Sequence, residues 1–282
     1  MAKKNSSSFL PNSANYYSDS RKSRLEGGRV VVWFSCGATS AVAAKLAAQK
    51  YQGERDVHVV YCDTGGEHKS NKIFLREVEK WVGCKVKRLR NKRYRDHFDV
   101  YRKEGYIIGP HGAKCTQVLK RRLRQAYEDV ESDIQVFGFS VEEIERAENF
   151  RMRNLDVYLE TILIDNGLSK MDCLAILQKE GIDLPFMYLT QRSGAPYGHN
   201  NCLPCVKGGA GYFNKIRIDF PKLFWKMARI EEFLNQTCVV YRGKRIFLKD
   251  LPKDAGRFEE EQSIECGLIC EAALEDIRHS DS

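Results

Sequence analysis

The stretch RVVVWFSCGATSAVAAKLAAQ, residues 29–49, decides the fold. Residues 30–34 are successive apolar side chains, as expected for a strand buried on both faces of a parallel sheet. Small residues then form a turn at 35–40, and an Ala-rich helix is expected over 41–52. A turn of this kind lets backbone N–H groups approach a phosphate at a helix N-terminus. The alternative is an ordinary turn between a strand and a helix.

The same alternation continues along the chain. Apolar runs predict further strands over residues 57–62, 85–89, 134–137 and 158–164. Periodicity predicts further helices over residues 71–82, 117–130, 142–153 and 169–179. Strands that alternate with helices predict an α/β fold with an open, doubly wound parallel sheet of the Rossmann-like kind. Beyond residue 181 the pattern becomes irregular, with a helix expected over 220–234 and a hairpin turning at Gly243.

Composition bounds the class of protein. The chain has 282 residues, of which 43% are hydrophobic, enough for a substantial core. Because it lacks a long apolar run and a secretory signal, we expect a cytoplasmic protein, and we expect it to form a homo-oligomer. The expected parts are a disordered basic tail (1–28), a nucleotide-binding α/β domain (29–200) and a cysteine-containing C-terminal region (201–282).

The charge of the chain favours anionic partners. The formal net charge is +8, and basic residues gather at 85–95 and at 120–124. Such clusters suit the phosphates of a nucleotide or of a nucleic-acid backbone, although solvated surface is the alternative. We expect Lys120 and Arg121 to face the site, because they follow Cys115 by about one helical turn.

Two further turns carry glycine and polar residues at predicted strand ends. Asp63, Thr64 and Gly65 follow the second strand, and Gly138 follows a later one. Because ligands bind beyond the carboxyl ends of parallel strands, we expect these turns to share one rim with residues 35–40. The phosphate-loop pattern GxxxxGK[ST] and the dinucleotide pattern GxGxxG are both absent.

Five motifs together resemble one known family. SCGATS (35–40) is similar to the PP-loop, and DTG (63–65), the Cys115 segment, CLPC (202–205) and ECGL (265–268) follow in the family's order. The chain resembles the phosphoadenosine phosphosulfate (PAPS) reductase family of the PP-loop adenine-nucleotide alpha-hydrolase superfamily. The resemblance implies nucleotide binding by Ser35, Cys36, Gly37, Ala38, Thr39, Ser40, Asp63, Thr64, Gly65, Gly138, Lys120 and Arg121.

The sequence departs from the family's pattern at several positions. Thr39 stands where the PP-loop usually has aspartate, and Cys36 replaces its first glycine. Lys114 precedes a single Cys115 where cluster-bearing reductases have a tandem cysteine pair. Ile269 stands where histidine would follow ECGL. Ser40, which ATP-splitting members usually retain, is present.

The cysteines at motif positions suggest a metal centre. Cys202 and Cys205 have the spacing of a ligand pair, and the glycine-rich segment after them argues against a thioredoxin-like pair. Two free thiols are the alternative. With Cys115 they would supply three ligands, and Cys270 the fourth, of a [4Fe–4S] cluster or a zinc site. Cys266 would then be the catalytic nucleophile, although the roles of Cys266 and Cys270 could be exchanged.

Three functions follow from these observations. The first is reduction of a sulfonucleotide, PAPS or APS, to sulfite through Cys266, with a thioredoxin-type reductant as partner. The second is an ATP-dependent sulfurtransferase that thiolates a nucleic acid. The third is a non-catalytic protein that binds a nucleotide or a nucleic acid on the same scaffold.

Overall fold

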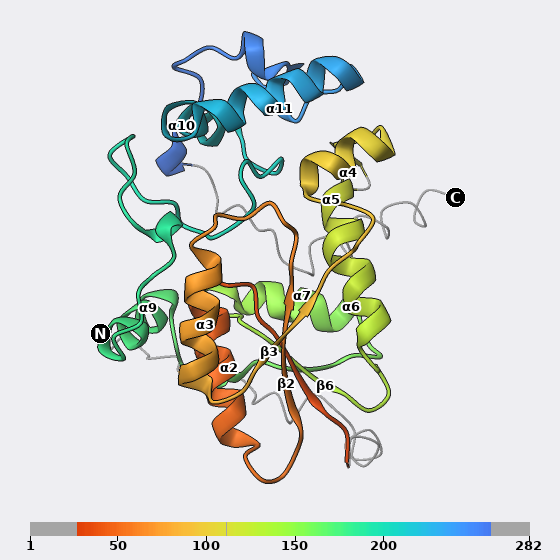
Figure 1. The fold of residues 1–282 in the computed structure, drawn as a ribbon, viewed down its shortest axis with the longest axis vertical. Helices are drawn as coiled ribbons and strands as arrows, with labels where there is room; N and C mark the ends of the chain where they lie inside the picture. The colour runs from red at the N-terminus through yellow and green to blue at the C-terminus, as the bar shows by residue number, and fades with distance from the viewer. Residues whose placement is uncertain (1–26, 111, 261–282) are drawn as a thin grey trace, which may run out of the picture.

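The computed structural model describes residues 27–110 and 112–260 and contains a parallel five-stranded sheet in the order β3-β2-β1-β6-β7 (Figure 1). Its strands are β1 (Val30–Trp33), β2 (Val57–Cys62), β3 (Val86–Leu89), β6 (Ile134–Phe137) and β7 (Tyr158–Glu160). Every neighbouring pair is parallel. The predicted α/β fold with an open parallel sheet is therefore confirmed.

Helices cover both faces of this sheet. Successive side chains of β1 point to opposite faces, so each set packs against different helices. Val30 and Val32 belong to a core with α2 (Ala38–Lys50), α3 (Asn71–Val82), α8 (Ile162–Asp165) and α9 (Lys170–Lys179). Val31 and Trp33 pack instead toward α6 (Arg122–Tyr127) and α7 (Ile144–Arg153). All four of these β1 side chains are buried, which explains the unbroken apolar run in the sequence.

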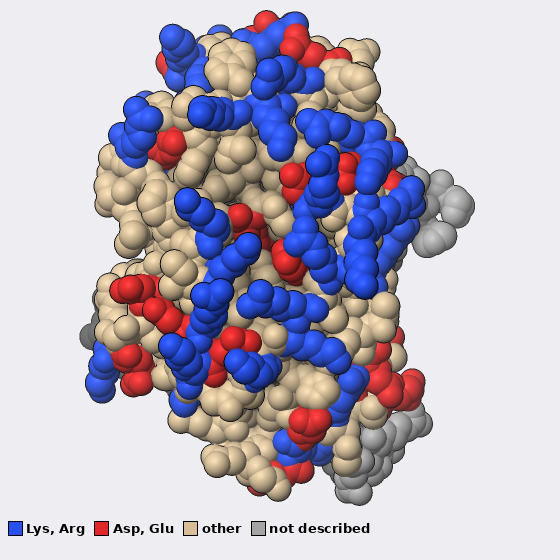
Figure 2. All heavy atoms as spheres, viewed as in Figure 1, with Lys and Arg blue, Asp and Glu red and all other residues tan. Residues whose placement is uncertain are grey.

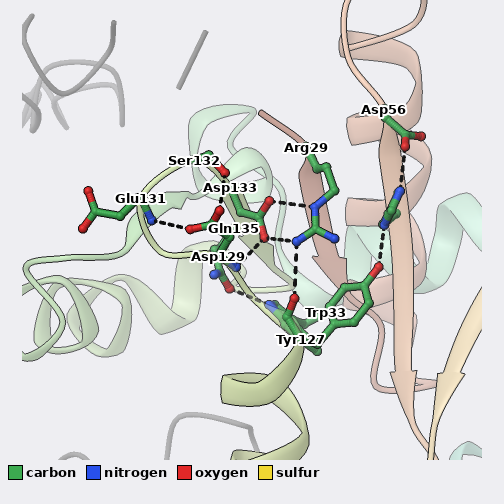
Figure 3. A network of polar contacts seen from close by, with 10 residues as sticks. Arg29, Trp33, Asp56, Tyr127, Asp129, Glu131, Ser132, Asp133 and Gln135 are labelled. Atoms are coloured by element: carbon green, nitrogen blue, oxygen red, sulfur yellow. Dashed lines mark hydrogen bonds and ion pairs between the residues drawn. The ribbon is translucent and has the colours of Figure 1, made fainter. Parts of the chain in front are cut away.

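A polar network ties β1 to β6 at the end of the sheet opposite the predicted ligand rim (Figure 3). Arg29 donates two hydrogen bonds to Asp133, of 2.9 and 2.7 Å, and the Asp133 side chain is fully buried. Further along the strands, the indole N–H of Trp33 donates to Gln135 Oε1 at 2.7 Å. This bond fixes the Trp33 ring, which is only 2% exposed, between the sheet and the helices α6 and α7.

A second hydrophobic core lies beside the sheet and contains the CLPC segment. It unites α4 (His97–Glu104), the segment after it, α10 (Ala210–Asp219), α11 (Pro221–Leu234) and the hairpin of β8 (Val239–Tyr241) and β9 (Lys244–Ile246). Tyr101, Leu119 and Phe213 are buried together there with Cys205. Residues that are far apart in the sequence thus form one hydrophobic cluster.

Several predicted elements match and others differ. The predicted bounds of β2, α3 and β6 are those observed, and the hairpin at Gly243 is confirmed. The strand expected over residues 158–164 ends at Glu160, because Ile162 and Leu163 turn into α8 and pack against the core with α2. Besides α8 and the short α5, two longer helices among the described residues were not predicted, namely α4 and α10.

The remaining short elements connect these layers. They are the pair β4 (Ile108–Gly109) and β5 (Gly112–Ala113), then α5 (Lys114–Thr116), η2 (Gln117–Arg121), η3 (Val141–Glu143), η4 (Phe186–Tyr188), η5 (Leu248–Asp250) and η6 (Phe258–Glu260). Among the described residues, no helix is both long and apolar enough to span a membrane.

Candidate functional site

A cavity of about 390 Å³ opens at the carboxyl ends of β1 and β6. This is the point where the order of the strands reverses, since the chain proceeds from β1 to β2 on one side and returns to β6 on the other. The predicted residues that line it are Ser35, Gly37, Thr39, Ser40, Gly138 and Lys120. Aromatic rings of Trp33, Phe34, Phe137, Phe139 and Tyr188 line it as well.

The Ser40 hydroxyl organises the loop at 35–40. Its oxygen accepts the backbone N–H of Ser35 at 3.1 Å and of Gly37 at 3.3 Å, and it donates to the Gly37 carbonyl at 3.0 Å. Ser40 is 2% exposed, whereas Ser35 is exposed and contacts the same hydroxyl at 3.1 Å. The loop therefore presents converging N–H donors at the N-terminus of α2, and Ser40 satisfies them internally.

Cys36 adopts the left-handed backbone conformation, with φ of 58°. Glycine occupies this conformation freely, while a residue with a Cβ is strained by about 1–2 kcal/mol. The family's glycine is replaced here, and the strain is held by packing, because Cys36 is fully buried and Asn200 donates to its carbonyl at 2.7 Å. Burial, with Glu67 nearby, raises the pKa of the Cys36 thiol well above its usual value.

Gly138 allows β6 to approach the loop. A Cβ at this position would lie 2.7 Å from the Ser40 nitrogen and 2.8 Å from its Cα. Since these are backbone atoms, no side-chain movement would relieve the overlap. The glycine thus sets the width of the cavity between the two strand ends.

The turn after β2 depends on contacts with distant residues. Asp63 accepts the Gly65 N–H at 3.0 Å and binds Arg90 at 3.0 Å. Gly65 has a φ of 67°, and a Cβ there would lie 2.0 Å from the Arg95 carbonyl oxygen. Asp63 and Gly65 line a second cavity rather than the first, and Thr64 points toward Cys202.

Lys120 reaches the first cavity from η2, a π-helical segment. Its side chain is largely buried, and its charge acts on Cys36 and Cys62. Burial raises the pKa of the Cys62 thiol to about 12, and Lys120 opposes this shift. Of the remaining predicted residues, Cys36 and Ala38 are buried within the loop, and Arg121 is not among the residues that line either cavity.

Sequence reasoning missed several residues of the first cavity. Glu67 accepts hydrogen bonds from Tyr61 at 2.5 Å and Asn71 at 3.0 Å. Lys170 enters from the start of α9, where burial lowers its pKa. Tyr188 lies over the loop, 3.3 Å from where a Gly37 Cβ would be, and burial raises its pKa to about 12. Only Glu67 had a signal in the sequence, as it lies two residues beyond DTG.

Three cysteines at motif positions lie near enough to Tyr101 to act on its hydroxyl. The Tyr101 hydroxyl donates to Cys115 Sγ at 3.2 Å, and Cys115, Cys205 and Cys202 add to the effect of burial in raising the Tyr101 pKa. Cys202 Sγ lies 3.1 Å from Thr64 Oγ1, and the Leu203 N–H donates to the Gly66 carbonyl at 2.9 Å. The CLPC segment is thus bonded directly to the turn after β2.

These thiols do not form a complete metal site by themselves. In the part of the chain that the structure describes, no group of three or more His, Cys, Asp or Glu side chains could hold a metal ion. The predicted nucleophile Cys266 and the predicted fourth ligand Cys270 lie outside the described residues. The cluster and the zinc site both stay predictions.

The second cavity, of about 450 Å³, lies beside the first and shares Tyr61 and Glu67 with it. It is lined by residues of β2, β3 and the start of α3. Four of its side chains are cationic, and two, Asp63 and Glu67, are carboxylates. The cations are Lys69, Lys72, Arg88 and Arg90.

A family model agrees with the motifs and the site. The model described as the phosphoadenosine phosphosulfate reductase domain matches residues 29–243. The chain belongs to this family. The match includes the loop at 35–40, the turn after β2, Lys120 and the CLPC segment.

Two individual proteins are also similar to this PAPS reductase-family chain. An uncharacterized nin region protein, ORF290 of Escherichia phage lambda, is 49% identical over 51 residues, which is 18% of this chain and 18% of that protein. The U34-tRNA thiolase NcsA from Methanococcus maripaludis, solved with its [4Fe-4S] cluster, is 13% identical. That superposition covers 75% of this chain and 74% of the thiolase, with a TM-score of 0.45.

Proposed function

We propose that the protein binds an adenine nucleotide in the first cavity and uses it in sulfur chemistry, with reduction of a sulfonucleotide to sulfite as the reaction. One observation carries the proposal. The loop at 35–40, Gly138 and Lys120 meet around a single cavity at the reversal of the strand order. Membership of the PAPS reductase family supports the nucleotide as the ligand.

The walls of the cavity suit the two ends of such a ligand. Aromatic rings, including Trp33 and Phe137, offer an apolar surface to adenine. The N–H groups of the loop and the Lys120 ammonium group offer donors and positive charge to the phosphate and sulfate. Since Ser40 now accepts the loop N–H groups, the anion would take its place as their acceptor.

In the proposed reduction, the thiolate of Cys266 attacks the sulfur atom of PAPS or APS. The bond from sulfur to the phosphate oxygen breaks, and the nucleotide leaves with both electrons of that bond. The product is an S-sulfocysteine. A thioredoxin-type dithiol then attacks the Cys266 sulfur, sulfite leaves, and the second thiol of the reductant resolves the mixed disulfide and restores Cys266.

Anaerobic turnover separates this reaction from its rivals. The purified protein is incubated with APS, PAPS or ATP and a thioredoxin system, and sulfite, AMP and pyrophosphate are measured. The proposal expects sulfite from APS or PAPS, and expects Cys266→Ser to bind the nucleotide without releasing sulfite. Nucleotide binding with no turnover of any of the three would instead support the non-catalytic alternative.

The second candidate is an ATP-dependent sulfurtransferase that thiolates a nucleic acid. The cationic cavity beside the nucleotide cavity favours it, because an acceptor bound there would lie next to the activated nucleotide. The loop would then hold the pyrophosphate that leaves ATP. Release of pyrophosphate from ATP that increases when DNA or RNA is added would establish this reaction in place of reduction.

We further propose that Cys115, Cys202, Cys205 and Cys270 hold a [4Fe–4S] cluster, with zinc as the alternative. Cys115 accepts a hydrogen bond from Tyr101, Cys202 and Cys205 act on the same hydroxyl electrostatically, and all-thiolate ligation suits both groups. An iron–sulfur cluster would supply electron transfer, and zinc a tetrahedral anchor. Iron, sulfide and zinc are measured in anaerobically purified protein and in Cys115→Ser, with Cys84→Ser as the control. Stoichiometric zinc without sulfide would overturn the cluster.

A further inference from the structure

We infer that the second cavity and the edge of the sheet beside it bind a single-stranded nucleic acid through its phosphates. The surface consists of five exposed cations, here called the basic track: Lys69, Lys72, Arg76, Arg88 and Lys92. They come from the turn before α3, from the first half of α3, from the edge strand β3 and from the loop after it. Lys and Arg side chains cross the middle of the molecule on the face shown in Figure 2.

The charges of the basic track are not neutralised by the protein. Within residues 27–110 and 112–260, none of the five forms an ion pair. Their neighbours differ, since Arg90 binds Asp63 at 3.0 Å and Arg93 and Arg95 lie 3.7 and 3.9 Å from Glu104 and Asp99. Like charges left together without partners repel one another, and a bound polyanion relieves this repulsion. Binding also releases the counterions condensed on the polyanion, which favours the complex.

The track converges on a concave site rather than spreading over a convex surface. Lys69, Lys72 and Arg88 line the cavity of about 450 Å³, together with Arg90 and two carboxylates. Asp63 is bound by Arg90, and Glu67 accepts hydrogen bonds from Tyr61 and Asn71. Glu67 keeps its negative charge, but the four cations of the lining outnumber its two carboxylates, so a phosphate that enters would meet a net positive charge.

An aromatic platform lies at the same cavity. The His68 imidazole lines it and stacks on Phe186, with ring centres 4.5 Å apart and an angle of 21° between the rings. Phe186 is 36% exposed. Cationic grooves with stacking platforms are typical of proteins that bind single strands, because every base offers a π-face.

The size of the track favours a strand over a small nucleotide. A small nucleotide would contact only the residues that line the cavity, whereas Arg76 and Lys92 lie outside that lining. The shared wall of Tyr61 and Glu67 places the strand next to the nucleotide cavity. The inference deepens the second candidate function, but binding of the strand can be measured without turnover.

Fluorescence anisotropy with labelled single-stranded DNA and RNA of about 16 nucleotides tests the inference. The variant combines Lys69→Ala, Lys72→Ala and Arg88→Ala. The control combines Lys179→Ala, Lys222→Ala and Lys253→Ala, which remove three exposed lysines from α9, α11 and the loop after η5. We expect the variant to bind at least about tenfold more weakly and to lower the slope of log K against log salt by about 2. The control should bind as the wild type does.

Phe186→Ala tests the stacking platform separately. We expect about fivefold weaker binding with an unchanged salt slope, because stacking does not involve phosphate charge. The inference is overturned if the wild type does not bind either strand, or if the triple variant binds like its control. It is also overturned if the triple variant loses only its preference for PAPS over APS, since the cations would then serve the 3′-phosphate.

Binding of ATP, APS and PAPS is measured in parallel on the same proteins. If the strand binds but no nucleotide does, the proposed nucleotide site fails while this inference stands. If nucleotides bind equally to the wild type and the triple variant but no strand binds, the inference fails while the nucleotide site stands.

Discussion

The loop after β1 and the turn after β2 lie on one rim of the sheet, but different contacts hold them. The loop at 35–40 is organised by Ser40, a hydroxyl within the same six residues. The turn at 63–66 has local bonds to the Asp63 and Thr64 side chains, and it is also held from a distance, by Arg90, by the close approach of the Arg95 carbonyl, and by the bond from Leu203 to Gly66. The loop therefore takes most of its hydrogen bonds from its own residues, apart from the bond from Asn200 to the Cys36 carbonyl, whereas the second turn takes several of its contacts from distant segments.

This comparison predicts the largest loss of stability at Gly65. Gly65→Ala adds backbone strain at a φ of 67° and brings a Cβ within 2.0 Å of the Arg95 carbonyl. We expect the free energy of unfolding to fall by about 2–5 kcal/mol in urea denaturation. Gly53→Ala is the control, because its φ is 78° but nothing lies within 4 Å. It should lose only about 1–2 kcal/mol, and equal losses would contradict the role of the close approach.

Gly138→Ala tests the spacing between β6 and the loop. Its Cβ would press on the Ser40 backbone, so we expect a loss of about 1–3 kcal/mol in the free energy of unfolding and weaker nucleotide binding. Gly198→Ala lies at the same cavity with nothing within 4 Å and should change stability by less than about 0.5 kcal/mol. Wild-type stability and affinity in Gly138→Ala would show that the loop can shift without cost.

Ser40→Ala tests whether the loop organises itself. The N–H groups of Ser35 and Gly37 would lose their acceptor, and we expect a loss of about 1–2 kcal/mol in thermal or urea unfolding. Ser35→Ala removes an exposed hydroxyl and should stay within about 0.5 kcal/mol of the wild type. A larger loss at Ser35 than at Ser40 would reverse the account of the loop.

The smallest predicted effect concerns Cys36. Because its φ is 58°, we expect Cys36→Gly to be more stable than Cys36→Ala, by about 1 kcal/mol. Cys173 is equally buried but lies inside α9, so Cys173→Gly should be less stable than Cys173→Ala by about 1 kcal/mol. If the alanine variant were the more stable one at both positions, Cys36 would carry no backbone strain.

The sequence predicted the sheet well because its signals are local. Apolar runs bounded by small residues marked β1, β2 and β6, and the helix predicted over 169–179 begins after Ser169, which caps it together with Asp172. The strand at 158–164 was overextended because its apolar side chains suit a strand or a buried helix equally. The helix α10 was missed because Gly208, Gly209 and Gly211 surround its start, and burial of Tyr212 and Phe213 stabilises it instead.

The candidate site was predictable where its residues belong to turns that follow strands. Ser40, Gly138 and Lys120 line the first cavity as the spacing suggested. Lys170 and Tyr188 were not predicted, because each follows an unrelated element and reaches the cavity only through packing against α2. The link between the CLPC segment and the turn after β2 likewise joins residues far apart in the sequence.

The central claim, that the first cavity binds an adenine nucleotide, is tested most directly by the fluorescence of Trp33. Trp33 lines the cavity, and a variant with Trp81→Phe and Trp225→Phe leaves it as the only tryptophan in the chain. Titration with ATP, APS and PAPS should give a saturable change in its emission with at least one nucleotide, and Gly138→Ala should weaken it. No saturable change with any of the three, in protein shown to be folded, would contradict the claim.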